Sequence, residues 1–356
     1  MNRLLCLFGL VGVGGFLFNR EEKLRMKKKT HKRLFRSLFA ILLMSFLGSG
    51  AVLAYELVIA PAQNQNTLNQ YKDLLYGNTS SKLSASSNGQ ATPEAPPSSD
   101  TSSEPSATEP LEVLDKFRPL LNRNEDTAGW LKIPGTSLDH PVFFTPDNPD
   151  YYLKKDPNGR FDKYGSLYIA GNCSLSPQSQ ILVMYGHNME YDDLMFGQLM
   201  LFKKFDFLKK HPTFTFDTIY REGQWKIIAV CRASKYETAL FPYTNTDFVH
   251  EEQFNAYIYQ ARIRSAYYIP DDPRIDDSYL VMSTCDYFFW GDRTVIIARR
   301  LRDDESADTI DTSAYQKNPV RLWPDRYYAL DFITASRPSD EAIRDGYEAF
   351  YGNSEN

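Results

Sequence analysis

The sequence predicts a mainly β fold, a barrel or a sandwich of eight short strands, with an N-terminal helix and a helical insert. Three observations support this prediction. After Trp130, short β-type runs alternate with turns rich in Gly, Pro, Asn and Asp. Two segments in that part, 194–210 and 251–265, have a helical pattern instead. A Ser/Thr/Pro-rich stretch separates this part from an apolar segment near the N-terminus.

The N-terminal part is typical of a membrane anchor. Residues 1–36 carry a net charge of +8 and residues 37–356 a net charge of −13. Residues 38–55 hold no charge and are long enough to span a bilayer as a helix. Since clustered Lys and Arg stay in the cytoplasm, we expect a single-pass protein of the cell membrane with residues 1–36 cytoplasmic, an uncleaved anchor at 37–60 and an extracellular remainder.

Two alternatives concern this N-terminal part. A signal peptide that is cleaved has the same order of basic and apolar residues, but its apolar region is usually shorter than 38–55. The three lysines after Met26 resemble the start of a signal segment. We therefore favour a translation start at Met26 as a hypothesis.

Charge and motifs exclude several function classes. The acidic remainder argues against nucleic acid as a partner, because nucleic-acid binding needs positive charge on the folded surface. No HExxH, CxxC or Gly-rich phosphate loop is present, so we expect no cofactor and no metal. The acidic runs at 271–272 and 303–305 are interpreted as solvated surface rather than as a calcium site.

Residues 61–110 are expected to form a flexible linker. Positions 78–110 contain 14 Ser/Thr, five Pro and no aromatic residue, which buries too little apolar surface to offset the entropy of ordering. A short helix is expected within 63–76. Residues 302–356 form an acidic extension whose role the sequence does not predict, although 322–333 is apolar enough to pack on another part.

The folded domain is expected at 111–301. An amphipathic helix should begin it, because apolar residues recur there at spacings of three and four: Leu111, Leu114, Phe117 and Leu121. Eight strands are expected after it, in the segments WLKI, HPVFF, GSLYIA, QILVMY, TFTFDTIY, QWKIIAVCRA, SYLVMS and RTVIIARR. The helical insert at 251–265 comes just before the strand SYLVMS.

Three of the four cysteines follow the anchor, so at least one of them has no partner within the chain. A free thiol outside the cell is a liability that suggests a function. Cys285 ends an apolar strand, where a side chain can face a cleft. Cys231 lies within an apolar run, as expected of a core residue, and Cys173 lies in a loop. Cys285 is therefore the candidate nucleophile.

A nucleophilic thiol needs a base. The part after the anchor offers four histidines: His140, His187, His211 and His250. His187 follows an apolar strand directly after a glycine that lets the chain turn, which makes it the candidate partner of Cys285. An ordinary histidine at a strand end remains the alternative.

Acyl transfer also needs fixed donors for the developing oxyanion. Arg293 begins a strand eight residues beyond Cys285, and a return between antiparallel neighbours would bring the two side by side. Arg299, Arg300 and Arg302 lie at the far end of that strand and are interpreted as surface charges.

These motifs resemble the class B sortases, cysteine transpeptidases that attach proteins to Gram-positive cell walls. The resemblance covers about 111–301 and rests on the following segments: YGHNM, STC with its following Arg, NEDTAGWLKIPGTSLDHPV, DNPDYYL, GSLYI and MFGQL. It implies an eight-stranded sortase-type β-barrel and a catalytic group of His187, Cys285 and Arg293. Two positions depart from the family pattern: Met282 replaces a Leu, and Ala170 replaces an Asp of many relatives.

The resemblance also implies a reaction and its partners. Cys285 would cleave a C-terminal sorting motif of secreted proteins through a thioester. His187 would protonate the leaving amine and then deprotonate the incoming one, an amine of a peptidoglycan precursor, cross-bridge or pilin. Arg293 would hold the oxyanion or the substrate backbone. A secreted cysteine peptidase, which passes the same thioester to water, is the alternative.

Four further residues are expected to contact the substrate: Tyr185, Asn188, Ser283 and Thr284. Because side chains alternate along a strand, Ser283 should face the cleft together with Cys285, while Thr284 should order the site by hydrogen bonding. Asp286 is adjacent to Cys285, and the same alternation places it on the opposite face.

Overall fold

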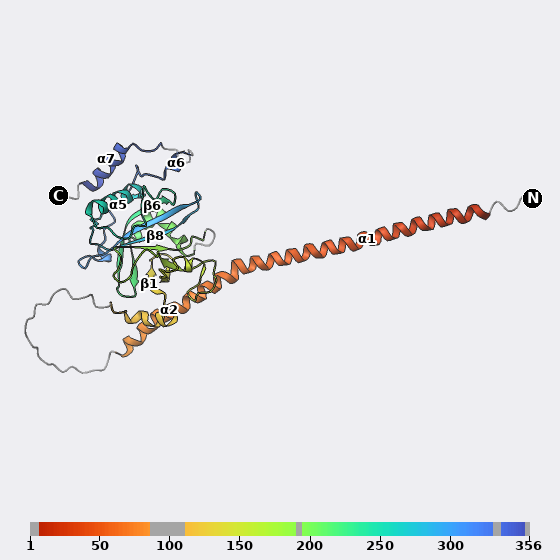
Figure 1. Cartoon of the computed structure of the whole chain (residues 1–356), viewed down its shortest axis with the longest axis horizontal. Coiled ribbons are helices and arrows are strands. Elements are labelled where there is room, and N and C mark those ends of the chain that lie inside the picture. Colours follow the sequence, from red (N-terminus) through yellow and green to blue (C-terminus); the bar gives the residue numbers. More distant parts are fainter. Residues whose placement is uncertain (1–6, 86–110, 190–193, 330–335, 353–356) are drawn as a thin grey trace, which may run out of the picture. The chain divides into compact units, whose positions relative to one another are not determined.

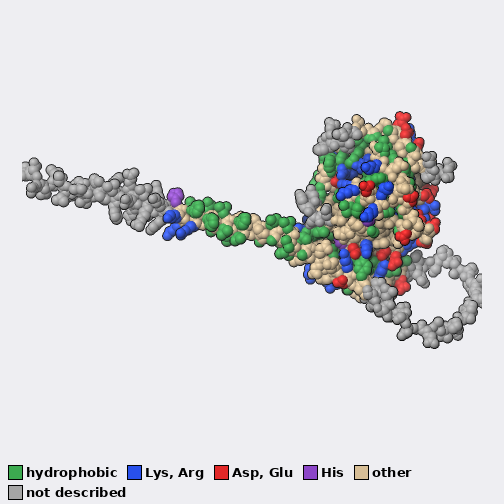
Figure 2. All heavy atoms as spheres, turned by 180° about the vertical axis from the view of Figure 1, so that it is seen from behind, with side chains coloured by type: hydrophobic (Ala, Val, Ile, Leu, Met, Phe, Trp, Pro, Cys, Tyr) green, Lys and Arg blue, Asp and Glu red, His purple; other side chains and the backbone are tan. Residues whose placement is uncertain are grey.

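The computed structural model describes residues 7–85, 111–189, 194–329 and 336–352. The chain divides into two units, Met1–Gln63 and Asn64–Asn356. In the first unit, helix α1 (Leu7–Ala54) passes through a π-helical turn, η1 (Tyr55–Ile59), into α2 (Ala60–Ala85). By length and composition the stretch His31–Gly77 can cross a membrane, a property that a signal sequence shares. Figure 2 shows Lys and Arg side chains directly before its apolar part.

Helix α2 replaces the first part of the predicted linker. Residues 61–85 are helical rather than flexible, and from Asn64 onward this helix belongs to the second unit. Its residues Leu68, Tyr71 and Leu75 are buried within that unit. The Tyr71 hydroxyl donates a hydrogen bond of 2.6 Å to the Pro157 carbonyl. The helix is thus longer than the one expected at 63–76, because a row of apolar residues finds a surface to cover. The rest of the predicted linker, 86–110, lies outside the described residues.

Eight strands close into a barrel in the order β1-β2-β3-β4-β8-β9-β6-β5. Figure 1 shows the strands of this barrel, with β1, β6 and β8 labelled. Their bounds are β1 Thr127–Lys132, β2 Asp139–Phe143, β3 Leu167–Ile169, β4 Ile181–Tyr185, β5 Thr213–Thr218, β6 Gln224–Ser234, β8 Tyr279–Asp286 and β9 Asp292–Arg300. The pairs β2-β3 and β4-β8 are parallel and the other pairs are antiparallel. The predicted eight-stranded barrel is confirmed, with one strand in each predicted segment.

The core lies inside the barrel and beneath its cover. Strands β4 and β8 are buried on both faces, which explains why their sequences are continuous apolar runs instead of alternating ones. The cover on the β6 side is the helical insert α5 (Glu251–Arg264), predicted at 251–265. The predicted helix at 194–210 is divided into η4 (Phe196–Lys203) and α4 (Phe205–Lys210).

The helix predicted around 111–121 is shorter than expected. Only η2 (Asp115–Phe117) and α3 (Arg118–Arg123) are helical, because the amide of Leu114 donates to the carbonyl of Ile219 at 2.8 Å and holds the preceding residues extended. The remaining elements are η3 Tyr151–Lys154, β7 Tyr267–Tyr268, η5 Ala307–Thr309, β10 Gln316–Lys317, α6 Asp325–Ala329 and α7 Asp340–Tyr351.

The C-terminal extension packs on the domain. Strand β10 pairs with β7, and α7 lies beside α5, where Ile343 joins Leu322 and Ile263 in an apolar cluster (Figure 1). The amide of Leu322 donates to the carbonyl of Ile263 at 2.8 Å. The expected packing of 322–333 is therefore present as far as residue 329, and 330–335 lie outside the described residues.

Two predictions about surface charge are wrong for Arg299 and Asp271, although Asp272, Asp303 and Asp304 are exposed as expected. The Arg299 side chain is 1% exposed and forms ion pairs with Asp271 at 2.8 Å and Glu305 at 2.7 Å. Asp271, expected on a solvated face, is 2% exposed and also pairs with Lys226 at 3.0 Å. Arg302 forms an ion pair with Asp277 at 2.7 Å. The reason is that the start of the extension folds back over the end of β9 and excludes water there.

Candidate active site

Cys285 and Arg293 lie directly opposite each other on β8 and β9. Opposed residues of an antiparallel pair project to the same face with Cβ atoms about 5 Å apart. The loop 287–291 joins the two strands, and Gly291, with φ of 85°, adopts the left-handed conformation that its turn requires. The short return expected between these strands therefore brings a thiol and a guanidinium together.

His187 lies at the same end of the barrel. In the parallel pair β4-β8, Tyr185 is level with Ser283, and β4 ends there. The residues on either side of His187, Gly186 and Asn188, are then hydrogen-bonded to Thr284 and Cys285. The parallel register thus brings together two residues that are far apart in the sequence. The sequence made His187 a candidate partner of Cys285 because both lie at the end of an apolar strand, but the register that aligns them comes from the fold.

The His187 ring is held by a backbone carbonyl. Its Nε2 lies 2.7 Å from the oxygen of Leu153, and since a carbonyl can only accept, Nε2 carries the proton and Nδ1 is free to act. Burial lowers the pKa of His187 below its usual value of 6.5, and the bond to Leu153 offsets this only partly. The imidazole is therefore mainly neutral at pH 7.

Three hydrogen bonds tie the His187 segment to the Cys285 strand. Asn188 Nδ2 donates to the Cys285 carbonyl at 2.9 Å, and Thr284 Oγ1 donates to the Gly186 carbonyl at 2.7 Å. The Tyr287 hydroxyl donates to the Asn188 carbonyl at 2.8 Å. Asn188 and Thr284 are both buried, so their polar groups serve to fix the two strand ends.

Ser283 and Tyr185 share the face of Cys285. Ser283 is buried, and its hydroxyl has no hydrogen-bond partner within the described residues. Tyr185 contacts the ring of Tyr168, with centroids 5.7 Å apart, and burial raises the pKa of Tyr185 to about 12. Both phenols therefore stay protonated and can donate hydrogen bonds.

Sequence reasoning missed Tyr243, which comes from the loop between β6 and α5. It is 4% exposed, and burial raises the pKa of its hydroxyl. The neighbouring Ser283 and the positive charge of Arg293 lower this pKa, but by less than burial raises it. The residue is one of many tyrosines in the chain, and nothing in its local sequence marks it. Only the folded loop brings it to the face of Cys285.

Asp286 points to the other face, as the alternation predicts. Its Oδ2 accepts hydrogen bonds from Lys203 Nζ at 2.6 Å, Arg232 Nε at 2.9 Å and Thr294 Oγ1 at 3.0 Å. Burial favours the neutral acid, but these cations outweigh it and hold the pKa of Asp286 below its usual range. The carboxylate is charged and fully engaged, away from the thiol.

The two other thiols and His140 are unsuited to catalysis. Cys173 and Cys231 are buried and free, and burial raises their pKa to about 11 and about 12. His140 is 2% exposed, and burial lowers its pKa to about 4. Of the described cysteines, Cys285 alone is partly exposed.

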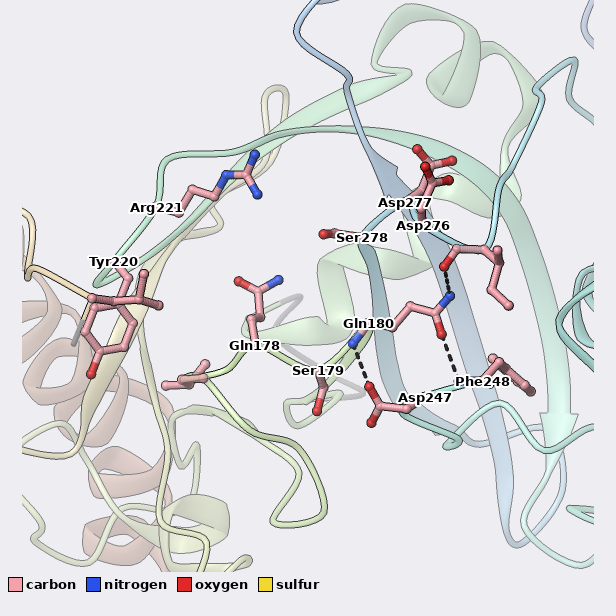
Figure 3. A pocket seen from close by; sticks show the side chains of 13 residues that line it. Gln178, Ser179, Gln180, Tyr220, Arg221, Asp247, Phe248, Asp276, Asp277 and Ser278 are labelled. Carbon is pink, nitrogen blue, oxygen red and sulfur yellow. Dashed lines mark hydrogen bonds between the residues drawn. The ribbon is translucent and has the colours of Figure 1, made fainter. Parts of the chain in front are cut away.

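A separate pocket of about 510 Å³ opens at the opposite end of the barrel, beside the first residues of β4 and β8 (Figure 3). Gln180 lies within it, and its Oε1 accepts a hydrogen bond of 2.9 Å from the backbone amide of Phe248. The backbone amide of Gln180 donates to Asp247 Oδ1 at 2.9 Å. Since Cys285 lies roughly 20 Å away along β8, this pocket is not part of the candidate site. Within the described residues, no group of three or more His, Cys, Asp or Glu side chains could hold a metal.

The fold is that of the sortases, a class of cysteine transpeptidases. It matches a Staphylococcus aureus sortase B–substrate complex with a TM-score of 0.56 at 20% identity, over 69% of this chain and 99% of that one. It also matches a Bacillus anthracis protein similar to sortase B, with a TM-score of 0.53 at 22% identity, over 67% of this chain and 96% of that one. At these identities the matches show the shared fold alone.

The sequence comparison identifies the family. The chain is 32% identical to sortase B of Listeria monocytogenes over 176 residues, which cover 49% of this chain and 69% of that protein. It is 26% identical to sortase B of Staphylococcus aureus over 192 residues, which cover 53% of this chain and 76% of that protein. No family model matches. The chain belongs to the sortase B family and is a sortase-type cysteine transpeptidase.

Proposed function

We propose that this transpeptidase cleaves a sorting motif in secreted proteins through a thioester on Cys285 and transfers the acyl group to an amine of peptidoglycan or of a pilin. The observation that supports this most is the register that sets Arg293 opposite Cys285, together with the hydrogen bonds that hold the His187 segment beside it. A nucleophile, a base and a cation at one end of the barrel are what acyl transfer requires.

In the first step, Cys285 Sγ attacks the carbonyl carbon of the scissile amide while neutral His187 takes the thiol proton at Nδ1. The lowered pKa of His187 supplies this acceptor form at neutral pH. Arg293 donates to the oxyanion of the tetrahedral intermediate. When the C–N bond breaks, the imidazolium returns the proton to the leaving amine, and a thioester remains.

In the second step, the incoming amine attacks the thioester carbonyl and gives a proton to His187. The new amide forms as Cys285 Sγ leaves and recovers its proton. Arg293 stabilises the second oxyanion as it did the first. Hydrolysis follows the same path with water as the nucleophile, so exclusion of water decides between the transpeptidase and the peptidase alternative.

Ser283 and Tyr185 are the residues that we propose to contact the substrate, because they share the face of Cys285. The unpartnered hydroxyl of Ser283 is suited to a backbone group of the sorting motif. Asn188 and Thr284, expected at first to bind substrate, are assigned to holding the strand ends through their bonds to Cys285 and Gly186.

We also propose the topology and domain limits expected from the sequence. Residues 1–36 remain in the cytoplasm, one helix anchors the protein at 37–60, and the transpeptidase domain lies outside the cell. The basic side chains before the apolar stretch support this orientation (Figure 2). Because Leu68, Tyr71 and Leu75 pack on the domain, we extend its N-terminal limit to include α2 from Asn64.

The test uses the full chain in detergent with a library of sorting-motif peptides and an amine or hydroxylamine, read by mass spectrometry. Amine-captured product that is lost in Cys285→Ala and retained in Cys231→Ala supports the proposal. Purely hydrolytic product at saturating amine identifies a peptidase instead. Full activity of Cys285→Ala refutes the site.

A further inference from the structure

Besides the pairing of β10 with β7 and the ion pairs over the end of β9, the extension contacts the domain through α7 and through residues 323–327. Helix α7 packs on the insert α5, where Arg262 Nη1 donates to the Tyr347 hydroxyl at 3.3 Å. The Tyr351 hydroxyl of α7 accepts a hydrogen bond of 3.2 Å from the backbone amide of Ile269. These contacts lie away from the catalytic strands. The second contact, made by 323–327, lies on the loop that joins β8 to β9.

Tyr327 is the centre of this second contact. It is 1% exposed, and its ring stacks on Phe288 with centroids 5.3 Å apart and meets Phe289 edge-on at 4.8 Å. Trp323 stacks on the other side at 5.3 Å. The guanidinium of Arg232 lies 5.2 to 5.3 Å from the centroids of three of these rings, Phe288, Trp323 and Tyr327. The extension thus packs against the apolar side chains of the loop, although Phe288 remains 50% exposed.

Two polar groups of the extension bind Asp292, the first residue of β9. The Tyr327 hydroxyl donates to its carboxylate, and Arg326 forms an ion pair with it. Arg326 Nη1 also donates to the Trp290 carbonyl at 2.7 Å. Asp292 is 1% exposed and lies directly opposite Asp286, so two buried carboxylates face each other across the pair. Like charges so placed are destabilising unless each has its own cation.

Asp292 in turn holds Arg293. The Arg293 Nη1 donates to the Asp292 carbonyl at 3.0 Å. A continuous series of contacts therefore leads from Tyr327 and Arg326, through the side chain and then the backbone of Asp292, to the guanidinium opposite Cys285. By these contacts the extension holds Asp292 at the start of β9, and Asp292 in turn holds the donors of Arg293.

We propose that Tyr327 and Arg326 are positioning residues for Arg293, and that the C-terminal extension thereby contributes to the transpeptidase reaction. By fixing Asp292, they hold the Arg293 guanidinium where the oxyanion forms. This inference depends on the role proposed above for Arg293. It gives residues 302–356 a function that the sequence did not indicate.

The test compares Tyr327→Phe with Tyr347→Phe in the full chain, using a cleavable sorting-motif peptide and an amine. The first variant keeps the stacked ring and loses only the hydroxyl that binds Asp292. A matched hydroxyl is lost from α7 in the second. Since a hydrogen bond to a buried carboxylate is removed, we expect kcat to fall about tenfold in Tyr327→Phe with KM within twofold, and no more than a twofold change in Tyr347→Phe.

A double-variant cycle with Arg293→Lys separates positioning from general stability. If Tyr327 acts through Arg293, Tyr327→Phe lowers kcat by less than twofold in the Arg293→Lys background. An undiminished tenfold effect there, or no effect in the native background, overturns the proposal. If Tyr327→Phe unfolds, Arg326→Lys takes its place in the cycle with the same expected outcomes.

The same assay distinguishes the two proposals. Retained activity in Cys285→Ala would reject the proposed function itself. Loss of activity in Cys285→Ala and a lowered but measurable kcat in Arg293→Lys, together with wild-type kcat in Tyr327→Phe, would reject only the role of the extension.

Discussion

Substitution of Asp286 by Asn should lower stability while sparing catalysis. The amide has nearly the shape of the carboxylate and can still accept from Thr294 Oγ1, which lies 3.0 Å from Oδ2. It cannot neutralise Lys203 and Arg232, whose nitrogens lie 2.6 and 2.9 Å from the same oxygen. The variant therefore removes one charge from a buried group of three and leaves two cations facing each other.

The size of the loss follows from the exposure of the partners. Breaking a buried ion pair costs about 3–5 kcal/mol, whereas an exposed pair is worth at most about 1 kcal/mol. The Asp286 and Arg232 side chains are 6% and 15% exposed, but Lys203 is 36% exposed and can turn into water. We therefore take the lower limit, about 3 kcal/mol, which corresponds to a fall in Tm of about 5 °C for a unit of this size.

Thermal unfolding followed by tryptophan fluorescence measures this loss, and peptide cleavage measures activity. Asp272→Asn is the matched control, because Asp272 is 71% exposed and its pair with Arg274 should contribute less than about 0.5 kcal/mol. We expect kcat/KM of Asp286→Asn to fall less than tenfold. A stable variant without activity would show instead that Asp286 takes part in the reaction.

The pH dependence has a definite sign. The folded pKa of Asp286 lies below the ordinary value of 3.8, so its contribution to stability is present above that value and is lost as the pH falls through the folded pKa. The difference in stability between the native protein and Asp286→Asn should therefore be constant from neutral pH to about 5 and disappear in more acidic solution.

Three further predictions concern single groups. The His187 imidazole should titrate below 6.5 in NMR spectra because it is buried, and a midpoint above 6.5 would contradict the acceptor role assigned to it. Iodoacetamide should alkylate Cys285 in the native protein and leave Cys173 and Cys231 unmodified until denaturant is added. Peptide mass spectrometry measures this labelling, and equal labelling of all three cysteines would contradict the burial described. Arg299→Met should lower the free energy of unfolding by about 3 kcal/mol or more, since it leaves the Asp271 carboxylate buried with one cation, and a change below 1 kcal/mol in urea unfolding would show that water reaches this site.

The strands and the Cys285–Arg293 pair could be predicted because their signals are local. Apolar runs between turn residues define each strand, and eight residues suffice only for a short return between neighbours. The pairing of His187 with Cys285 depends on the parallel register of β4 and β8, which no local pattern contains. The sequence made His187 only a candidate, because it follows an apolar strand, and the family resemblance strengthened this choice.

The errors concern residues whose partners are distant in sequence. Arg299 looks like a surface charge at a strand end, and only the fold shows that Asp271 and Glu305 enclose it. Tyr71 belongs to a polar segment, yet it is buried because Pro157 and Phe143 offer it a carbonyl and a ring. Composition measures the average of a segment, and these contacts depend on single side chains.

The parallel pairing of β4 and β8 also bears on how such an enzyme can change during evolution. Strand β4 ends at Tyr185, level with Ser283, and β8 continues to Asp286, so the relative height of His187 and Cys285 depends on the ladder between the strands and not on the length of chain that connects them. Insertions in 194–278, including α5, can alter the outer surface without shifting that height. The outer surface of the barrel can therefore change while the catalytic geometry is kept.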